Sequence, residues 1–173
     1  MLLEEVYFWT ITIVKWKHLL KQDKYKKVII ESLQYLVSKE LIKVYGFVVM
    51  PNHVHIIWEM LKMNQKELPD SSFTKFTAHC FKKDLSVNHP NVLEVFKSDK
   101  YDRQFQFWQR DPLAIRIIDR EMLIQKLNYI HFNPLNEKWN LAKRPEEYKW
   151  SSANFYETGI NDFNILTHYM DRY

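Results

Sequence analysis

The most informative stretch of the chain is LIKVYGFVVMPNHVHIIWE, residues 41–59. It contains two runs rich in β-branched and aromatic residues, at 41–50 and 53–59, and each of them predicts a strand. The pair Pro51-Asn52 between the runs is typical of turns. We therefore expect two consecutive strands joined by a short connection.

The segments around this pair extend it to a larger pattern. The run VYFWTITIV at 6–14 predicts another strand, and Asp23 is expected to cap a helix whose apolar residues follow helical spacing. After the strand pair, Asp70 or Ser71 is expected to cap a second helix. The order predicts an α+β protein with a ferredoxin-like, split βαβ fold, an antiparallel sheet with helices on one face.

The last third of the chain adds short elements. Residues 105–108 and 114–118 have the composition of strands. Asp119 is expected to cap a third helix, which Pro134 ends. Residues 140–173 are expected to form a tail of short helices that packs back on the same single domain.

Composition excludes several classes of protein. The 173 residues contain 25 Lys and Arg against 21 Asp and Glu, a formal charge of +4. Only two glycines occur, which rules out a glycine-rich dinucleotide loop or a Walker A loop. The lone cysteine, Cys80, allows no internal disulfide and no cysteine-based zinc cluster. Neither an export signal nor a membrane span is predicted, so a cytoplasmic protein is expected.

Aromatic residues make up 16% of the chain. Bases stack on aromatic rings and phosphates attract cations, so many aromatics with a small basic excess suit a nucleic-acid binder. The same composition suits an aromatic-rich core equally well. Composition alone therefore leaves the function open.

His53 and His55 are two apart on a predicted strand. Alternate residues of a strand point to the same face, so both imidazoles can converge on one metal ion. Two histidines on the polar face of a half-buried strand would show the same pattern. The spacing alone does not separate these two interpretations.

Tyr129 and Asn133 lie one turn apart on the third predicted helix. With about 100° per residue, Tyr129 points about 120° and Asn133 about 80° away from the face expected to be buried. A surface tyrosine and a helix-ending asparagine would explain them separately. Together with the two histidines they could form an open metal site beside a tyrosine nucleophile for phosphoryl transfer. His131 lies roughly 160° around the helix from Tyr129 and is not expected to act as its base.

Four sequence boxes, in the same order, resemble those of one family. The segments are MPNHVH at 50–55, WQ at 108–109, YIHFNP at 129–134 and PEEYKWSS at 145–152. They are similar to the motifs MPNHVH, WQ, YIHxNP and PEDYxWSS of the REP-associated branch of the HUH single-tyrosine transposases.

One departure is visible. The family motif after NP carries a small residue and then glycine, where this chain has Glu137 and Lys138.

The resemblance implies a function and a set of site residues. Tyr129 would attack a phosphodiester of single-stranded DNA, forming a 5′-phosphotyrosine link and releasing a 3′-hydroxyl. His53, His55 and Asn133 would bind a divalent metal, Mg²⁺ or Mn²⁺. The substrate would be single-stranded DNA with a palindromic, hairpin-forming repeat. The protein itself would be bacterial and cytoplasmic, and associated with the nucleoid when bound to DNA. Whether the chain works as a monomer or a homodimer stays open.

Basic and aromatic residues outside this set are candidates for DNA contact. They are Lys75, Lys82 and Lys83 on the second predicted helix, and Trp108, Gln109 and Arg110 before the third. Each has an ordinary alternative, a solvated helix face for the lysines and a core position for the tryptophan. Two other functions also remain open. One is a nucleic-acid-binding module of the same fold, and the other is a metal-dependent nuclease that uses water as its nucleophile.

Overall fold

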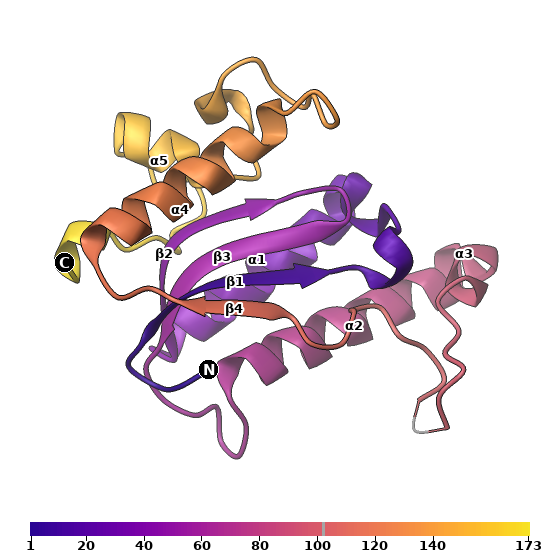
Figure 1. Ribbon diagram of the computed structural model, residues 1–173. Helices are drawn as coiled ribbons and strands as arrows, with labels where there is room; N and C mark the ends of the chain where they lie inside the picture. Colours follow the sequence, from indigo (N-terminus) through magenta and orange to yellow (C-terminus); the bar gives the residue numbers. More distant parts are fainter. Residues whose placement is uncertain (102) are drawn as a thin grey trace.

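The computed structural model describes residues 1–101 and 103–173. Its sheet has the order β2-β3-β1-β4, and neighbouring strands are antiparallel (Figure 1). The strands are β1 (Val6–Thr12), β2 (Ile42–Val49), β3 (His53–Met60) and β4 (Leu113–Arg116). The α-helices of the described residues are α1 (Asp23–Ser38), α2 (Pro69–Asn88), α3 (Pro90–Glu94), α4 (Arg120–Phe132) and α5 (Ala153–Thr158). The predicted ferredoxin-like α+β fold is confirmed.

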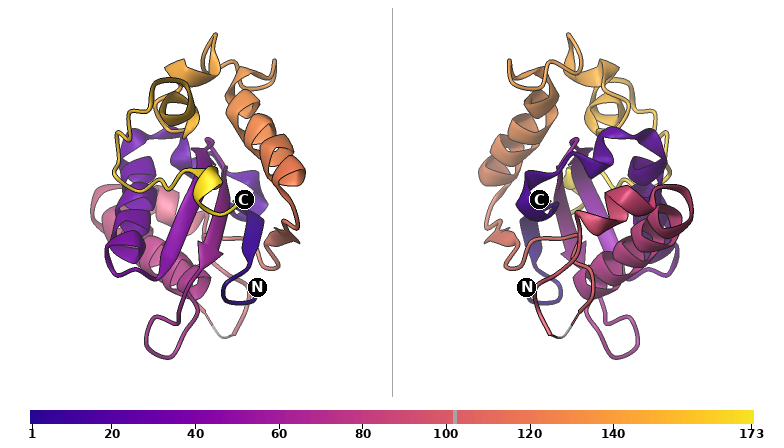
Figure 2. Two further views of the ribbon diagram at one scale, coloured as in Figure 1. Left: turned by 90° about the vertical axis from the view of Figure 1, so that its left-hand side faces the viewer. Right: turned by 90° about the vertical axis from the view of Figure 1, so that its right-hand side faces the viewer.

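One face of the sheet is packed against α1 and α2, while α4 lies across the other face (Figure 2). On the packed face the rings of Trp9 and Trp58 stack with centroids 4.9 Å apart. Phe73 of α2 meets both tryptophans edge-on and is completely buried. The two helices expected over one face are therefore α1 and α2, and this face holds the main aromatic core.

A polar contact joins these two helices near their ends. Asp84 of α2 accepts hydrogen bonds from Lys24 and Tyr25 of α1, each at 2.6 Å. Burial raises the pKa of this carboxyl, but the hydrogen bonds from Lys24, Tyr25 and Asn88 outweigh it and bring the pKa down to about 2. The charged form of Asp84 therefore stabilises the α1–α2 layer.

Gly46 allows α4 to approach the sheet. A side chain at this position of β2 would collide with Leu127 of α4, and it would also press on Ile130. Leu127 and Ile130 both belong to the buried stripe of α4, which lies over β2 and β3. Gly46, one of two glycines in the chain, thus sets the distance between the sheet and α4, the helix that carries Tyr129.

Several sequence predictions need correction at the ends of elements. Residues 105–108 form isolated bridges to Ile13 and Lys97 rather than a strand, and the last strand begins at Leu113. Asp119 caps α4 as predicted, because its side chain accepts from the Met122 N–H. Asp23 and Asp70 lie inside the first turns of α1 and α2 instead of capping them. Pro69 at the first position of α2 explains the second case, since it starts the helix two residues earlier than a cap at Asp70 would.

The C-terminal segment lies along the outer edge of β2. Backbone hydrogen bonds join Val49 to Trp150, Phe47 to Ser152 and Val44 to Thr167. This edge strand is therefore paired instead of being exposed. Among the described residues, none of the helices has both the length and the apolar character that crossing a membrane requires.

Candidate active site

A cleft of about 480 Å³ opens between the sheet and α4. Its floor is the sheet face opposite the tryptophan core, and α4 forms one wall. The predicted site residues that line it are His53, His55, Tyr129 and Asn133. The structure thus brings together side chains from positions far apart in the sequence.

His53 and His55 lie side by side on β3, with ring centroids 4.7 Å apart. Strand alternation places them on one face, while Val54 between them points into the packed core. Both are buried, with 7% and 4% of their surface exposed. The prediction that the two imidazoles share one face is confirmed.

Neighbouring polar groups orient both rings. His53 Nδ1 lies 2.7 Å from Asn52 Oδ1, and Asn52 Nδ2 donates to the Trp16 carbonyl at 3.2 Å. The second bond fixes the amide orientation, so the oxygen faces His53. An amide oxygen only accepts, so His53 carries its proton on Nδ1 and leaves the Nε2 lone pair free. His55 Nδ1 similarly pairs with Thr10 Oγ1 at 2.7 Å.

The imidazoles are held in their neutral form. Burial, with a smaller contribution from the nearby Lys138 ammonium, lowers the pKa of His53 to about 4. Burial lowers the pKa of His55 to about 3, with a smaller contribution from His53. Neutral imidazole with a free Nε2 and a hydrogen-bonded Nδ1 is the form that binds divalent metals. The donor set therefore fits a metal ion.

Asn133 lies beside the two imidazoles. Its side chain is 5% exposed, and Nδ2 donates to His55 Nε2 at 3.1 Å. To act as a third ligand, its amide must turn so that Oδ1 faces the ion in place of the Nδ2 that donates to His55 Nε2. The sequence placed Asn133 away from the buried stripe of α4, and that direction is the one that faces the sheet across the cleft. Among the described residues no group of three or more His, Cys, Asp or Glu side chains could hold a metal. A metal at this cleft would thus have two imidazoles and one amide, with coordination positions left for a substrate.

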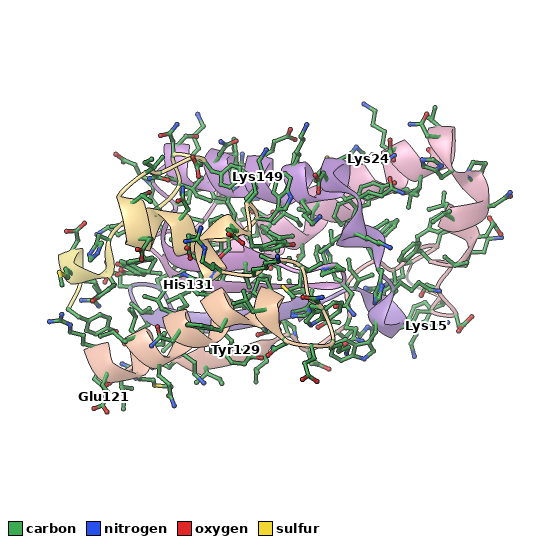
Figure 3. The ribbon with its side chains drawn as sticks, turned by 90° about the horizontal axis from the view of Figure 1, so that it is seen from above. Lys15, Lys24, Glu121, Tyr129, His131 and Lys149 are labelled. Atoms are coloured by element: carbon green, nitrogen blue, oxygen red, sulfur yellow. The ribbon has the colours of Figure 1, made fainter. Side chains whose placement is uncertain are left out.

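Tyr129 stands at the same cleft and is half exposed, at 52%. Its ring meets His55 and Phe8 edge-on, with centroids 5.4 and 5.9 Å away. Tyr129 and His131 leave α4 on opposite sides (Figure 3). His131 is buried and pairs through Nε2 with Ser152 Oγ at 2.8 Å, so it does not contact the tyrosine.

The predicted DNA-contact residues lie elsewhere. Lys75, Lys82 and Lys83 are exposed on α2, the helix that packs on the opposite face of the sheet from the cleft. Lys75 pairs with Glu67. The three lysines are not part of the wall around Tyr129.

Trp108 and its neighbours also lie outside the cleft. Trp108 is buried, and its indole N–H donates to Thr77 Oγ1 at 2.9 Å. Its ring is packed in the core, so the prediction that it is available to stack on a base is wrong. The Gln109 backbone N–H donates to the Thr12 carbonyl, which holds this segment beside β1. Arg110 is exposed and lines a separate cleft together with Trp108.

Sequence reasoning missed several residues that line the cleft. Lys126 lies one turn before Tyr129, with its ammonium 5.2 Å from the centroid of Phe8. Trp16, Lys138 and Trp139 line the other end. Lys126 could have been found from its spacing, because residues three apart share a helix face. The other three come from irregular segments that carry no such signal.

The turn after α4 closes without the glycine of the family motif. The Asn140 N–H and the Trp139 N–H both donate to the Asn136 carbonyl at 2.8 Å, and the Leu141 N–H donates to the Pro134 carbonyl. Asn140 takes the left-handed conformation with φ 45°, which asparagine tolerates. Glu137 and Lys138 therefore need no positive φ, and Lys138 is free to face the cleft.

Comparison with known proteins reveals a likeness in structure. No family model matches the chain, and no curated protein matches its sequence. A solved structure, a REP-associated tyrosine transposase bound to a REP hairpin, aligns with a TM-score of 0.60 and 16% sequence identity. The alignment covers 94% of this chain and 85% of that chain. The resemblance inferred from the sequence boxes is therefore confirmed in the fold, which this chain shares with a REP-associated tyrosine transposase.

Proposed function

We propose that this protein is a metal-dependent transposase and endonuclease that cleaves and rejoins single-stranded DNA at hairpin-containing sites. One observation carries the proposal. A half-exposed tyrosine, Tyr129, stands in a cleft beside two neutral imidazoles whose Nδ1 atoms are hydrogen-bonded and whose Nε2 atoms face Asn133 or the cleft. A binding surface would not require that arrangement.

His53, His55 and Asn133 are the residues that would hold the metal. When bound, a divalent ion would polarise the scissile phosphate and neutralise the charge that develops on it. Mg²⁺ and Mn²⁺ are the candidates. Two nitrogen donors suit Mn²⁺ better than Mg²⁺, which prefers oxygen.

The covalent step is assigned to Tyr129. Its phenolic oxygen attacks the phosphorus, and the bond from phosphorus to the 3′-oxygen breaks. The departing 3′-oxygen takes a proton from water, so the upstream strand leaves with a 3′-hydroxyl. The phenol proton passes to water in the open cleft, because His131 lies on the other side of α4. The tyrosine stays linked to the 5′-phosphate. Attack by a DNA 3′-hydroxyl reverses the step and rejoins strands without ATP, since a phenolate is a better leaving group than an alkoxide.

Hairpin DNA is the partner that we infer. The structural neighbour is bound to a REP hairpin, and this chain shares its fold. Two cationic side chains, Lys126 and Lys138, line the cleft and would neutralise phosphates of a bound strand.

The test is a covalent adduct on a denaturing gel. The protein is incubated with Mn²⁺ and a labelled pool of hairpin-bearing single-stranded DNAs with randomised flanks. We expect a protein–DNA band that disappears in EDTA and in Tyr129→Phe. Tyr35→Phe is a matched control, because Tyr35 is 51% exposed on α1, on the opposite face of the sheet, and should leave the band unchanged.

Two results would replace the proposal. Turnover that persists in Tyr129→Phe, with free 5′-phosphates as products, would identify a nuclease that uses water. DNA retention without any adduct, unaffected by EDTA, would identify a nucleic-acid-binding module.

A further inference from the structure

We propose that Trp16 and Trp139 form a base-stacking subsite for an unpaired nucleotide next to the scissile phosphate. The inference rests on the proposed function and adds to it the part of the substrate that the cleft recognises. Both indoles line the same cleft as His53 and Tyr129, at the end where the chain departs from the family motif.

Trp16 is exposed in a strained loop. Lys15 and Trp16 both take the left-handed conformation, with φ 55° and 56°, which is costly for residues other than glycine. Despite its size, the Trp16 side chain is 58% exposed. Figure 3 places Lys15, the neighbour of Trp16, beyond the C-terminal end of α4. A large aromatic side chain held in solvent by a strained backbone contributes little to the core.

Asn52 ties this loop to the metal-binding histidines. Its Nδ2 donates to the Trp16 carbonyl at 3.2 Å, while its Oδ1 pairs with His53 Nδ1 at 2.7 Å. Asn52 is buried, with 2% exposure, so both bonds are shielded from water. The position of Trp16 is therefore coupled directly to the orientation of His53.

Trp139 is presented to the cleft by the turn after α4. Its ring centroid lies 5.9 Å from that of His53 and 5.7 Å from that of His18. The ammonium of Lys138 lies 5.0 Å from the same indole. Lys138 and Trp139 thus place a cation and an aromatic face together beside the imidazoles.

This combination fits a single-stranded nucleotide. Aromatic rings stack on the faces of unpaired bases, and the bases inside a duplex are already stacked on each other. A cation beside the ring can contact the phosphate of the same nucleotide. Because the cleft is continuous with Tyr129, the stacked nucleotide would lie in the single strand that flanks the hairpin, close to the bond that is cut.

The experiment measures binding without cleavage. A fluorescein-labelled hairpin with single-stranded flanks, chosen from the randomised pool by binding alone, is titrated in EDTA with wild type, Trp16→Ala and Trp139→Ala. Each variant is expected to bind about 5- to 100-fold more weakly, the range for loss of one base-stacking contact. Tyr35→Ala removes a comparably exposed aromatic from the opposite face and should bind like wild type.

Abasic DNA shows whether the loss is due to stacking. A single abasic site is moved through the flanks one position at a time. At one position it should weaken wild type as much as Trp139→Ala does, and should add little to the effect of that variant. Trp139→Phe keeps an aromatic face and should recover most of the affinity. The unfolding midpoint of each variant is compared with that of wild type. Affinities are then compared only among variants that are folded under the binding conditions.

The outcomes separate this inference from the proposed function. Wild-type affinity in both tryptophan variants overturns the subsite, as does an equal loss of affinity for intact DNA and for every abasic DNA. Adduct formation by wild type in either case keeps the proposed function. If the abasic series identifies a stacked base but no adduct forms, the proposed function fails while single-strand recognition by the tryptophans is supported.

Discussion

Helices cover both faces of the sheet, but the two faces are built from different chemistry. Along β3, Val54, Ile56 and Trp58 point toward α1 and α2, whereas His53 and His55 point toward α4. The first face is closed by aromatic packing around Phe73. On the second face α4 lies over β2 and β3, and a cleft remains over β1 and β4.

The difference shows how one strand serves both stability and chemistry. Buried polar groups need hydrogen-bond partners, and the second face supplies them through Thr10 and Asn52. The first face is held mainly by apolar and aromatic packing, with a few polar contacts such as that between Trp108 and Thr77. We therefore expect substitutions on the packed face to change the free energy of unfolding, and substitutions in the cleft to change metal binding and cleavage.

The largest effect is expected for Phe73→Ala. Phe73 of α2 is completely buried against the two stacked tryptophans, so its removal should lower the free energy of unfolding by about 3–5 kcal/mol. Urea unfolding measures this value. Phe76→Ala, on the same helix but 46% exposed, should change it by less than about 0.5 kcal/mol. Loss of metal binding in folded Phe73→Ala would contradict the division between the faces.

His53→Ala should have the opposite profile. Loss of one imidazole should abolish Mn²⁺ binding in calorimetry and slow cleavage by about 10²–10³-fold, the cost of losing the electrostatic stabilisation that the bound ion would give the reacting phosphate. The melting temperature should change only modestly, because the side chain borders the open cleft. His79→Ala, on the exposed surface of α2, is the matched control. Global unfolding of His53→Ala would show that the histidine is structural.

The residues of the candidate site could be predicted from the sequence better than the residues around it. Strand alternation was enough to pair His53 with His55, and helical spacing gave the directions of Tyr129 and Asn133 relative to the stripe of α4. These are local periodicities, which the fold preserves. The burial of Asn133 was not foreseen, because it depends on how close Gly46 lets α4 come to the sheet.

Tertiary placement explains why Trp108 is not available to a base. The DNA contacts of Lys75, Lys82 and Lys83 stay predictions, because charge on one side of α2 indicates solvent but does not say on which side of the sheet that helix lies. Trp108 belongs to the core through its contact with Thr77, a residue 31 positions away, and no local pattern reports such a contact. The placement of Trp16 and Trp139 at the cleft depends on loop conformations that single residues do not specify.

A smaller effect is expected for Thr10→Val, which keeps the shape of the side chain and removes its hydroxyl. His55 Nδ1 would lose its 2.7 Å partner, so the ring would no longer be held with Nε2 toward Asn133. Loss of such a supporting contact should weaken Mn²⁺ affinity by about 10- to 100-fold. Calorimetry checks the value, and Thr10→Ser should restore it. Equal loss in Thr10→Ser would mean that packing at this position, and not the hydroxyl, supports the site.

The smallest effect returns to the packed face, where Asp84→Asn tests a charged clamp, the carboxylate of Asp84 with its donors Lys24 and Tyr25. The pKa of Asp84 is about 2 in the folded protein and 3.8 without the fold, so its charged form stabilises the folded state at neutral pH. Because the side chain is 28% exposed, solvent screening limits the contribution to about 1–2 kcal/mol. This contribution is fully present above about pH 4 and is lost as the pH falls toward 2.

The gap in unfolding free energy between wild type and Asp84→Asn should therefore shrink when urea unfolding is repeated from pH 7 down to pH 2. Glu31→Gln, an exposed carboxylate on α1, should show no such gap at neutral pH. Metal binding at pH 7 should be the same in Asp84→Asn and wild type, because the clamp lies on the face away from His53. A gap that stays constant with pH would assign the effect of Asp84 to packing instead of charge. A change in metal affinity would show that the α1–α2 layer and the cleft are coupled through the sheet.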